Sequence, residues 1–304
     1  MLDALRGMRK ALQGTGVSKI PGALAVNTWL YRVLKPRAVL SVVCRGNVIY
    51  VDGRDEGVGQ ALLRQDPFNP AETELFDSFV KPGMIVVDIG ANIGYFTLLA
   101  ARLLGGKGRV YAFEPEPANY ALLVKNIQAN AFTNVVPVQM AVSDQTGTHV
   151  LFRHRYNFGC HSLSKANATS YDGSTPVATT TLDHFFREVH PEDRIDLIKI
   201  DAQGAEGHII EGARELLGYT NPRIIMEFFP GALRNSGTDP TELLRRLRAY
   251  GFRIRLTEGS SAFPGDVAAE WMTGERQLPP DVESSVSLNL FLERGELGAG
   301  PTRS

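Results

Sequence analysis

Short apolar runs alternate with amphipathic stretches through the middle of the chain, from about residue 84 to residue 250. Apolar runs of about four to eight residues are typical of buried strands, whereas apolar positions recurring about every three to four residues are typical of helices. Strands that are apolar along their whole length favour a parallel sheet covered on both faces. The predicted strands are residues 84–88, 109–113, 134–142, 195–201 and 223–229, and the predicted helices are residues 93–104, 117–130, 205–217 and 239–250.

Other β-rich and helical patterns flank or interrupt this alternation. Two β-rich runs within residues 38–51, split by the sequence Arg-Gly-Asn, predict a hairpin. Proline and glycine at both ends of residues 67–83 predict a helix between them. Two short β patterns lie within residues 148–180, and late runs at 252–256 and 286–293 predict an antiparallel edge on the sheet.

The first 40 residues differ in charge from the rest, with seven basic side chains against one acid, Asp3. Apolar positions at helical spacing predict an amphipathic helix over residues 2–13. We interpret its basic face as solvated, on a helix that caps the main domain; a membrane surface or an acidic partner is the alternative. The predicted organisation is an N-terminal cap of helix and hairpin (1–66), an α/β domain (67–293) and a disordered tail (294–304).

Composition narrows the class of partner. Thirty-two basic and 33 acidic residues give a formal net charge of −1, which argues against nucleic acid. The two cysteines, Cys44 and Cys160, have no metal-ligand spacing and indicate free thiols in a reducing compartment. No apolar stretch approaches the about 18–20 residues that span a bilayer, and no secretory signal is recognisable. We therefore expect a cytoplasmic protein; no pattern indicates its oligomeric state.

Residues 85–97, IVVDIGANIGYFT, combine a strand, a glycine turn and a helix start, as nucleotide cradles do. The glycine spacing does not fit the dinucleotide fingerprint G-x-G-x-x-G, and the Gly-Lys-Ser/Thr end of a phosphate loop is absent. Instead, Asp88 precedes the two glycines Gly90 and Gly94. A carboxylate there opposes a pyrophosphate but favours a ligand that carries an ammonium and a sulfonium group.

Acidic residues stand at the ends of all five predicted parallel strands or just after them, at the rim where open α/β sheets bind ligands. Glu114 comes about where a βαβ unit returns an acid to ribose hydroxyls, and Gly90 would let the backbone approach the ligand. Together these features describe S-adenosylmethionine as the cofactor. Singly, Asp88 and Glu114 are explained as helix starts and Gly94 by tight packing. The strand-end acids are Asp88, Glu114, Asp144, Asp201 and Glu227.

Several stretches resemble the FkbM family of S-adenosylmethionine-dependent methyltransferases, over roughly residues 60–295. The resemblance implies a Rossmann-like class I methyltransferase fold, with a mostly parallel seven-stranded sheet and helices on both faces. The matching stretches are FVKPGMIVVDIGANIGYFT (79–97), VYAFEPEPANYALLVKNI (110–127), AVSDQTG (141–147), NFGCHSL (157–163), TLDHF (181–185), LIKIDAQGAE (197–206) and IIMEFFP (224–230).

The resemblance also implies roles for individual residues. Asp201 would lie at the mouth of the fourth strand, near the reactive methyl group. Gln203 departs from the family pattern, because an acid is frequent there, and this removes one charge near the acceptor. The implied cofactor contacts are Asp88, Gly90, Asn92 and Gly94 for the methionine part, Glu114 for the ribose, and Ser143 with Asp144 for the adenine.

Methyl transfer to a hydroxyl needs alignment of the acceptor oxygen and a base to take its proton. Asp201 and His161 are the preferred candidates, and Glu227 is a third. The alternatives are that His161 is an ordinary loop histidine and that Asp201 serves the cofactor. No metal is predicted, because no adjacent acidic pair follows the fourth strand and the histidines lack ligand spacing.

The predicted function is O-methylation, by S-adenosylmethionine, of a hydroxyl on a small molecule or glycan, such as a sugar or secondary metabolite. A non-catalytic cofactor-binding or scaffold protein is the alternative from another class, because fold does not determine function. A nicotinamide-dependent dehydrogenase is a third interpretation, which the glycine spacing disfavours. Acceptor contacts are expected from residues 148–180 and from the N-terminal cap.

Overall fold

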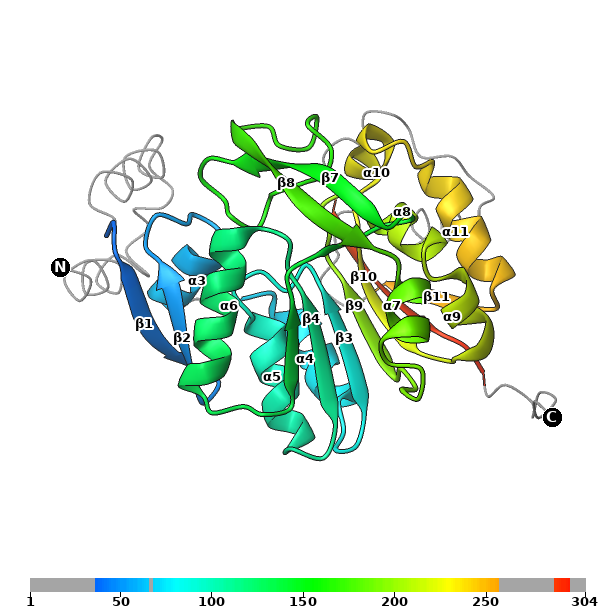
Figure 1. Cartoon of the computed structure of the whole chain (residues 1–304), viewed down its shortest axis with the longest axis horizontal. Coiled ribbons are helices and arrows are strands. Elements are labelled where there is room, and N and C mark those ends of the chain that lie inside the picture. Colours follow the sequence, from blue (N-terminus) through cyan, green and yellow to red (C-terminus); the bar gives the residue numbers. More distant parts are fainter. Residues whose placement is uncertain (1–35, 66–67, 257–286, 296–304) are drawn as a thin grey trace, which may run out of the picture.

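The structure is a computed structural model that describes residues 36–65, 68–256 and 287–295 (Figure 1). Three predictions lie outside these residues: the amphipathic helix over residues 2–13, most of the predicted tail, and the domain boundary between residues 66 and 67.

A seven-stranded sheet forms the centre of the molecule, with the strand order β11-β12-β10-β9-β3-β4-β5. The five strands β10, β9, β3, β4 and β5 run parallel to one another, whereas β12 runs antiparallel to both β10 and β11. The predicted mostly parallel sheet and its antiparallel edge are therefore confirmed. The strands are β3 Ile85–Ile89, β4 Arg109–Phe113, β5 Val135–Val138, β9 Leu197–Ile200, β10 Arg223–Phe228, β11 Arg253–Leu256 and β12 Leu288–Glu293.

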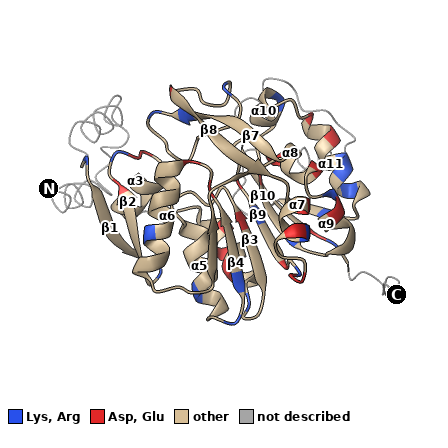
Figure 2. Cartoon of the chain, in the orientation of Figure 1, with Lys and Arg blue, Asp and Glu red and all other residues tan. Residues whose placement is uncertain are grey.

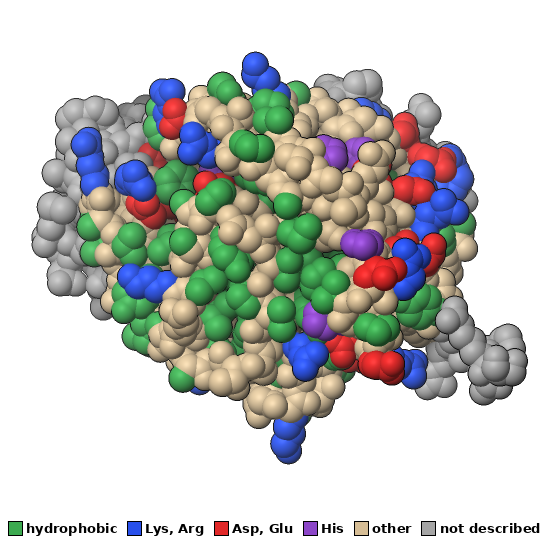
Figure 3. Space-filling model, viewed as in Figure 1, with side chains coloured by type: hydrophobic (Ala, Val, Ile, Leu, Met, Phe, Trp, Pro, Cys, Tyr) green, Lys and Arg blue, Asp and Glu red, His purple; other side chains and the backbone are tan. Residues whose placement is uncertain are grey.

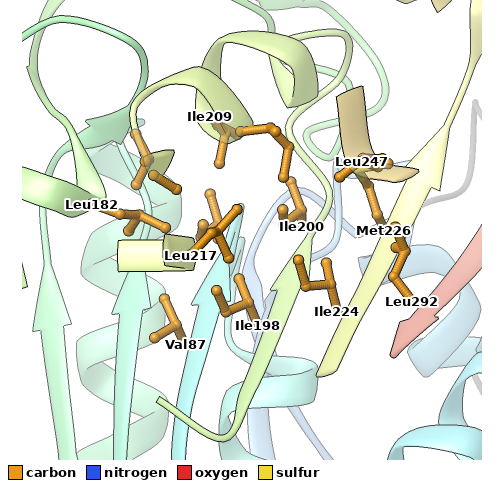
Figure 4. Packing of buried hydrophobic residues seen from close by; sticks show 14 of the residues in the cluster. Val87, Leu182, Ile198, Ile200, Ile209, Leu217, Ile224, Met226, Leu247 and Leu292 are labelled. Atoms are coloured by element: carbon orange, nitrogen blue, oxygen red, sulfur yellow. The ribbon is translucent and has the colours of Figure 1, made fainter. Parts of the chain in front are cut away.

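One face of this sheet packs against the helices of the second half of the chain. Val87, Ile198 and Ile224 point from three strands toward Leu182 and Leu217 on the covering helices (Figure 4). The alternation of side chains along a strand places every second residue on this apolar face. The covering helices are α7 Leu182–Glu188, α8 Glu206–Glu211, α9 Arg214–Tyr219, α10 Pro230–Asn235 and α11 Pro240–Ala249.

The opposite face packs against helices from the first half, and the predicted hairpin, which is confirmed, packs against α3, α5 and α6. Ile49 and Val51 of the hairpin are buried in one apolar cluster with α5 and α6. Asn126 of α6 accepts a hydrogen bond from the Tyr50 backbone N–H at 2.6 Å, which ties the hairpin to the domain. These elements are β1 Val39–Cys44, β2 Asn47–Asp52, α3 Val58–Arg64, α4 Pro70–Phe79, α5 Tyr95–Leu104 and α6 Pro117–Ala129.

A second, three-stranded sheet of order β6-β8-β7 lies above the carboxyl end of the main sheet (Figure 1). The prediction of one strand over 134–142 is wrong, because β5 ends at Val138. The Met140 N–H donates to the Val138 carbonyl at 3.0 Å, and the next residues form the short strand β6, which pairs with β8 instead of continuing the main sheet. This tight turn redirects the chain over the rim. The strands are β6 Ala141–Val142, β7 Gly147–His154 and β8 Tyr171–Thr180.

The single helix predicted over 205–217 is two helices, α8 and α9. At Gly212 an added Cβ would lie 2.1 Å from the Ser143 carbonyl oxygen, so the chain passes too close to β6 for a regular helix with side chains. The Asp183 carboxylate accepts from the N–H groups of Glu215 and Leu216 and thereby starts α9. Sequence periodicity missed α3, α7 and α10, because six or seven residues are too few to show it.

Charged side chains gather over α9 and α11, at the right of the molecule (Figures 2 and 3). Arg246 of α11 pairs with Glu211 at 2.6 Å, which joins that helix to the end of α8. This face is therefore solvated and polar. Among the helices that the structure describes, none is long and apolar enough to cross a membrane.

Candidate active site

A pocket opens at the carboxyl ends of β3, β4 and β9, where ligands of open α/β sheets bind. It contains about 890 Å³ of space, part of it open to solvent. Residues 158–159 and 161–163, between β7 and β8, line it together with these strand ends. Of the nine residues predicted for the site, six line this pocket, namely Asp88, Gly90, Asn92, Glu114, His161 and Asp201.

Asp88, near the end of β3, has a carboxylate oxygen without a partner. Its side chain is buried, and Oδ2 accepts the Thr97 hydroxyl of α5 at 2.6 Å. Oδ1 is buried and has no hydrogen-bond partner among the residues that the structure describes. Burial raises the pKa of Asp88, and the Lys199 ammonium and the Thr97 hydroxyl oppose that shift. A buried acceptor that lines a pocket is suited to a ligand that brings a donor.

Glu114, directly after β4, joins the turns that follow two neighbouring strands. Its carboxylate accepts from the Asn92 N–H at 2.8 Å and from the Glu116 N–H at 2.9 Å. Burial raises the pKa of Glu114 to about 8, although both backbone hydrogen bonds favour the ionised form. Each oxygen keeps a lone pair for a further donor, such as a ribose hydroxyl. Glu116, and not Glu114, caps α6, so the alternative that Glu114 serves only to start this helix is wrong.

Lys199 is a buried cation in the middle of β9, surrounded by carboxylates. Its Nζ lies 3.8 Å from Glu72 Oε1, 3.6 Å from Asp201 Oδ2 and 4.6 Å from the centre of the Phe96 ring. Burial alone would lower the pKa of Lys199, but the carboxylates of Glu72, Asp201 and Asp88 outweigh it and raise the pKa. For the carboxylate of Glu72, burial has the opposite effect and raises the pKa. The cluster is thus held together by one cation.

Sequence reasoning missed Glu72 and Lys199 as parts of the site. The available signal was a single charge within the apolar strand sequence LIKI, residues 197–200. A charged residue is almost never fully buried unless it is paired, so Lys199 required a partner. That partner, Glu72, lies on α4, and nothing in the sequence between them indicates the pairing.

Gln203 joins the acid that follows β9, Asp201, to Glu227 near the end of β10. Its amide nitrogen donates to Asp201 Oδ1 at 2.8 Å and to Glu227 Oε2 at 2.9 Å. Burial raises the pKa of Glu227 well above its usual range, and the nearby Asp201 charge adds to this. An acid at position 203 would replace two donors by a third negative charge. Glutamine is therefore the residue that lets Asp201 and Glu227 lie together.

The two glycines after β3 are required by the protein itself. An added Cβ on Gly90 would lie 1.8 Å from the Asp201 carbonyl oxygen, and the residue has a φ of 77°. On Gly94 it would lie 2.7 Å from Leu123 Cδ1 of α6. Close packing of the neighbouring strand end therefore demands Gly90 even without a ligand. At Gly94 the φ of 96° favours glycine, whereas the close atom is the end of a flexible side chain on a helix, so the explanation by helix–strand packing stays a prediction.

His161 belongs to a loop that three other segments hold in place. The Phe158 N–H donates to Asp55 Oδ1 at 2.9 Å, and the Ser162 hydroxyl donates to the Gln203 carbonyl at 2.8 Å. The His161 Nδ1 accepts from the His154 N–H at 2.9 Å. Burial lowers the pKa of His161 to about 4, so the imidazole is neutral near pH 7 and carries its hydrogen on Nε2.

Gly94, Ser143 and Asp144 are not among the residues that line the pocket. Asp144 lies instead beside His208 of α8, with Oδ2 3.2 Å from Nδ1, and its Oδ1 accepts the Ser143 hydroxyl at 3.1 Å. Although burial would raise the pKa of Asp144, the hydrogen bond and charge of His208 lower it. The adjacent residues Met140–Val142 do line the pocket.

Comparisons with known proteins agree with this geometry. A model of the methyltransferase FkbM domain matches residues 88–254, more than half of the chain. Methyltransferase sdnD of Sordaria araneosa is 29% identical over 157 residues, covering 43% of this chain and 60% of that protein. The 2-O-methyltransferase NoeI of Sinorhizobium fredii is 29% identical over 154 residues, covering 46% of this chain and 61% of that protein.

Among solved structures, methyltransferase FkbM from Methylobacillus flagellatus KT matches with a TM-score of 0.41 and 16% identity, covering 77% of this chain and 52% of that one. The chain spans about 60% of the length of the two curated relatives.

The sheet order, the glycine turn and the acidic rim define a Rossmann-like class I methyltransferase. This chain belongs to the FkbM methyltransferase family, whose domain model covers most of the residues that line the pocket and most of the sheet. The cofactor is S-adenosylmethionine. The residues present fit it, because Asp88 and Glu114 both line the pocket, Asp88 Oδ1 has no hydrogen-bond partner among the described residues, and each Glu114 oxygen accepts only one hydrogen bond there.

The first prediction tests the close approach at Gly90. We expect Gly90→Ala to lower the free energy of unfolding by about 2 kcal/mol or more, since backbone strain and a clash add. Gly106→Ala is the matched control: its φ is 76°, and an added Cβ there meets nothing within 4 Å. That variant should cost only about 1 kcal/mol. Urea unfolding measures the free energy of unfolding of both variants, and an equal loss of stability in the two would contradict the predicted clash at Gly90.

The second prediction tests the buried cation. Lys199→Met should cost about 3–5 kcal/mol at pH 8, because it leaves buried carboxylates without a counter-charge. Burial raises the folded-state pKa of Glu72 above its unfolded value, so its ionisation opposes folding above that value and stability returns as pH falls. The loss at pH 5.5 should therefore be smaller.

The control for this prediction is the double variant Lys199→Met with Glu72→Gln. It should recover part of the lost stability at pH 8, as a double-mutant cycle from urea unfolding would show. Equal losses at both pH values, with no recovery in the double variant, would mean that the cation is not needed.

Proposed function

We propose that this chain is an S-adenosylmethionine-dependent O-methyltransferase whose acceptor is a hydroxyl of a sugar, glycan or secondary metabolite. The observation that carries the proposal is the pocket at the rim of the sheet, where Asp88, Glu114 and Asp201 come together. Family membership supports methyl transfer, and the 2-O-methyltransferase among the relatives supports oxygen as the acceptor atom.

Asp88 and Glu114 hold the cofactor in this proposal. The free Oδ1 of Asp88 accepts from the ammonium group of the methionine part, and Glu114 accepts from the ribose hydroxyls. Gly90, Asn92 and Gly94 shape the turn between them. When bound, S-adenosylmethionine supplies a methyl group already activated by a sulfonium, so the protein has mainly to orient the acceptor.

Ser143 and Asp144 are proposed to act on the adenine from behind the pocket wall. They directly follow Met140–Val142, which line the pocket, and Asp144 is fixed there by His208. Their contribution is therefore to hold the wall against which the adenine packs.

Asp201 is the proposed general base. Its carboxylate lines the pocket and is 31% exposed, and Gln203 and Lys199 fix its orientation. The acceptor hydroxyl donates to Asp201 and gives up its proton there as the carbon–oxygen bond forms. Glu227 lies behind Gln203 and shares its amide, so it serves to position Asp201 rather than to take the proton.

His161 is proposed to donate a hydrogen bond to the acceptor rather than to act as a base. Its Nδ1 is occupied by the His154 N–H, and its Nε2 carries the hydrogen in the neutral form. A nitrogen that already holds a hydrogen accepts no proton. His161 therefore orients an acceptor oxygen from the loop side of the pocket.

The third prediction concerns the pH dependence of cofactor binding. The pKa of Glu114 is raised to about 8 in the free protein, and ribose hydroxyls bind the ionised form. Binding of S-adenosylhomocysteine should therefore strengthen as pH rises through about 8, and it should level off only above that value, where Glu114 is already ionised in the free protein. Glu114→Gln should bind at least tenfold more weakly and lose this pH dependence. Calorimetry decides, and an unchanged affinity in the variant would contradict the ribose assignment.

The fourth prediction concerns turnover. Asp201→Asn should reduce kcat at least a hundredfold, while the affinity for S-adenosylhomocysteine stays within about threefold. His161→Gln retains a donor in place of Nε2 and should keep at least a tenth of the wild-type kcat. The assay follows labelled methyl transfer into host-cell extract. A protein that binds S-adenosylhomocysteine but labels nothing would favour the non-catalytic alternative.

A further inference from the structure

A second cavity lies beside the cofactor pocket and contains about 1110 Å³ of space, part of it open to solvent. It shares Asn119, Phe158 and His161 with the pocket. A molecule that occupies this cavity therefore lies against the same loop that borders the reaction site. We call it the arginine cavity because four arginines line it, namely Arg37, Arg54, Arg153 and Arg155.

The acids that line the arginine cavity are already engaged. Asp52 pairs with Arg54 at 2.5 Å, and Asp172 lies 3.6 Å from Arg155. Glu116 is buried and caps α6, because its carboxylate accepts the backbone N–H of Asn119 in the first turn of that helix. Two of the four arginine charges are thus balanced locally.

The other two arginines, Arg37 and Arg153, leave a surplus of positive charge. Both are exposed, and neither forms an ion pair with a residue in the described ranges. The Arg153 guanidinium lies over β8, where a Cβ on Gly173 would be 2.8 Å from its Nη2. Burial is the main cause of the low pKa of His161, and the charges of His154 and Arg153 add to it, so Arg153 acts on the shared wall.

The two histidines of the arginine cavity also offer donors. The Nδ1 of His154 accepts the backbone N–H groups of Tyr156 at 3.2 Å and Asn157 at 3.0 Å, as the Nδ1 of His161 accepts that of His154. Burial lowers the pKa of His154, so both rings are neutral near pH 7 and carry hydrogen on Nε2. Guanidinium groups and N–H donors together match the oxygens of an anion.

We propose that the methyl acceptor is an anionic molecule, and that the arginine cavity binds its carboxylate, sulfate or phosphate group through Arg37 and Arg153. This inference rests on the proposed methyltransferase function and narrows its acceptor to sugars or metabolites that carry an acidic group. Guanidinium groups hold such groups with two parallel hydrogen bonds, which fixes orientation as well as position. Binding at the arginine cavity would thus present a hydroxyl of the same molecule to the adjoining pocket.

The test begins with labelled products. The full chain is incubated with tritiated S-adenosylmethionine and host-cell extract, and the products are separated on an anion exchanger at pH 7. We expect the label in the retained fraction. Phosphatase treatment releases a phosphate-bearing product, carbodiimide coupling neutralises a carboxylate, and a sulfate resists both. Label confined to the unretained, neutral fraction would overturn the inference and leave the methyltransferase proposal intact.

Variants of the arginine cavity provide the second measurement. Arg153→Gln and the double variant with Arg37→Gln should raise the KM for the retained product's precursor at least tenfold. Their affinity for S-adenosylhomocysteine should stay within twofold of the wild type. Arg153→Lys keeps the charge but loses the paired donors, so its KM should lie between the values of the wild type and of Arg153→Gln. The control is Arg245→Gln, an exposed arginine on α11, which should change neither quantity. An unchanged KM in the double variant would also overturn the inference.

Absence of any labelled product, with S-adenosylhomocysteine still bound, would count against the methyltransferase proposal and, with it, against an acceptor in the arginine cavity. The anion binding on which the inference is built is measured separately, by titrating inorganic phosphate into the protein loaded with S-adenosylhomocysteine. The wild type should bind phosphate at least tenfold more tightly than the Arg37→Gln, Arg153→Gln double variant, with an affinity that falls as salt is added. Equal binding by the two proteins would overturn it.

Discussion

The ammonium group of Lys199 is the charge on which the polar face of the sheet depends. Carboxylates of Glu72, Asp88 and Asp201 surround it, and they come from α4, β3 and the end of β9. A buried group of like charges without a counter-ion is strongly unfavourable. The cation therefore holds three elements in register while Asp88 Oδ1 keeps no hydrogen-bond partner within the described part of the chain, so the residues that stabilise this face are also those proposed to bind the ligand.

The two faces of the sheet divide these tasks. The face toward α7–α11 is packed with aliphatic side chains and holds the strands rigidly (Figure 4). The other face carries Asp88, Lys199 and Asp201 at alternate positions near the rim, because successive side chains point to opposite sides of a strand. A rigid apolar layer thus supports a rim of charged groups at fixed spacing.

The loop with Phe158 and His161 connects the cofactor pocket to the arginine cavity. Asp55, just before α3, and Gln203, after β9, hold this loop from two sides. The residues after the N-terminal hairpin therefore help to hold the loop that borders both the pocket and the cavity. Acceptor contacts from the N-terminal cap stay a prediction, which the presence of Asp52 of β2 in the lining of the arginine cavity supports.

The sequence alone was sufficient to predict the parallel sheet, its antiparallel edge, the hairpin and the acids at the strand ends, because local periodicity and glycine spacing encode them. It also indicated the cofactor, since carboxylates at one rim have a clear chemical preference. Only the tertiary structure paired Lys199 with Glu72, gave Gly90 its steric reason, split the helix at Gly212 and brought Arg37 and Arg153 to one cavity. Each of these depends on contacts between segments far apart in the chain, and such contacts leave no periodic trace in the sequence.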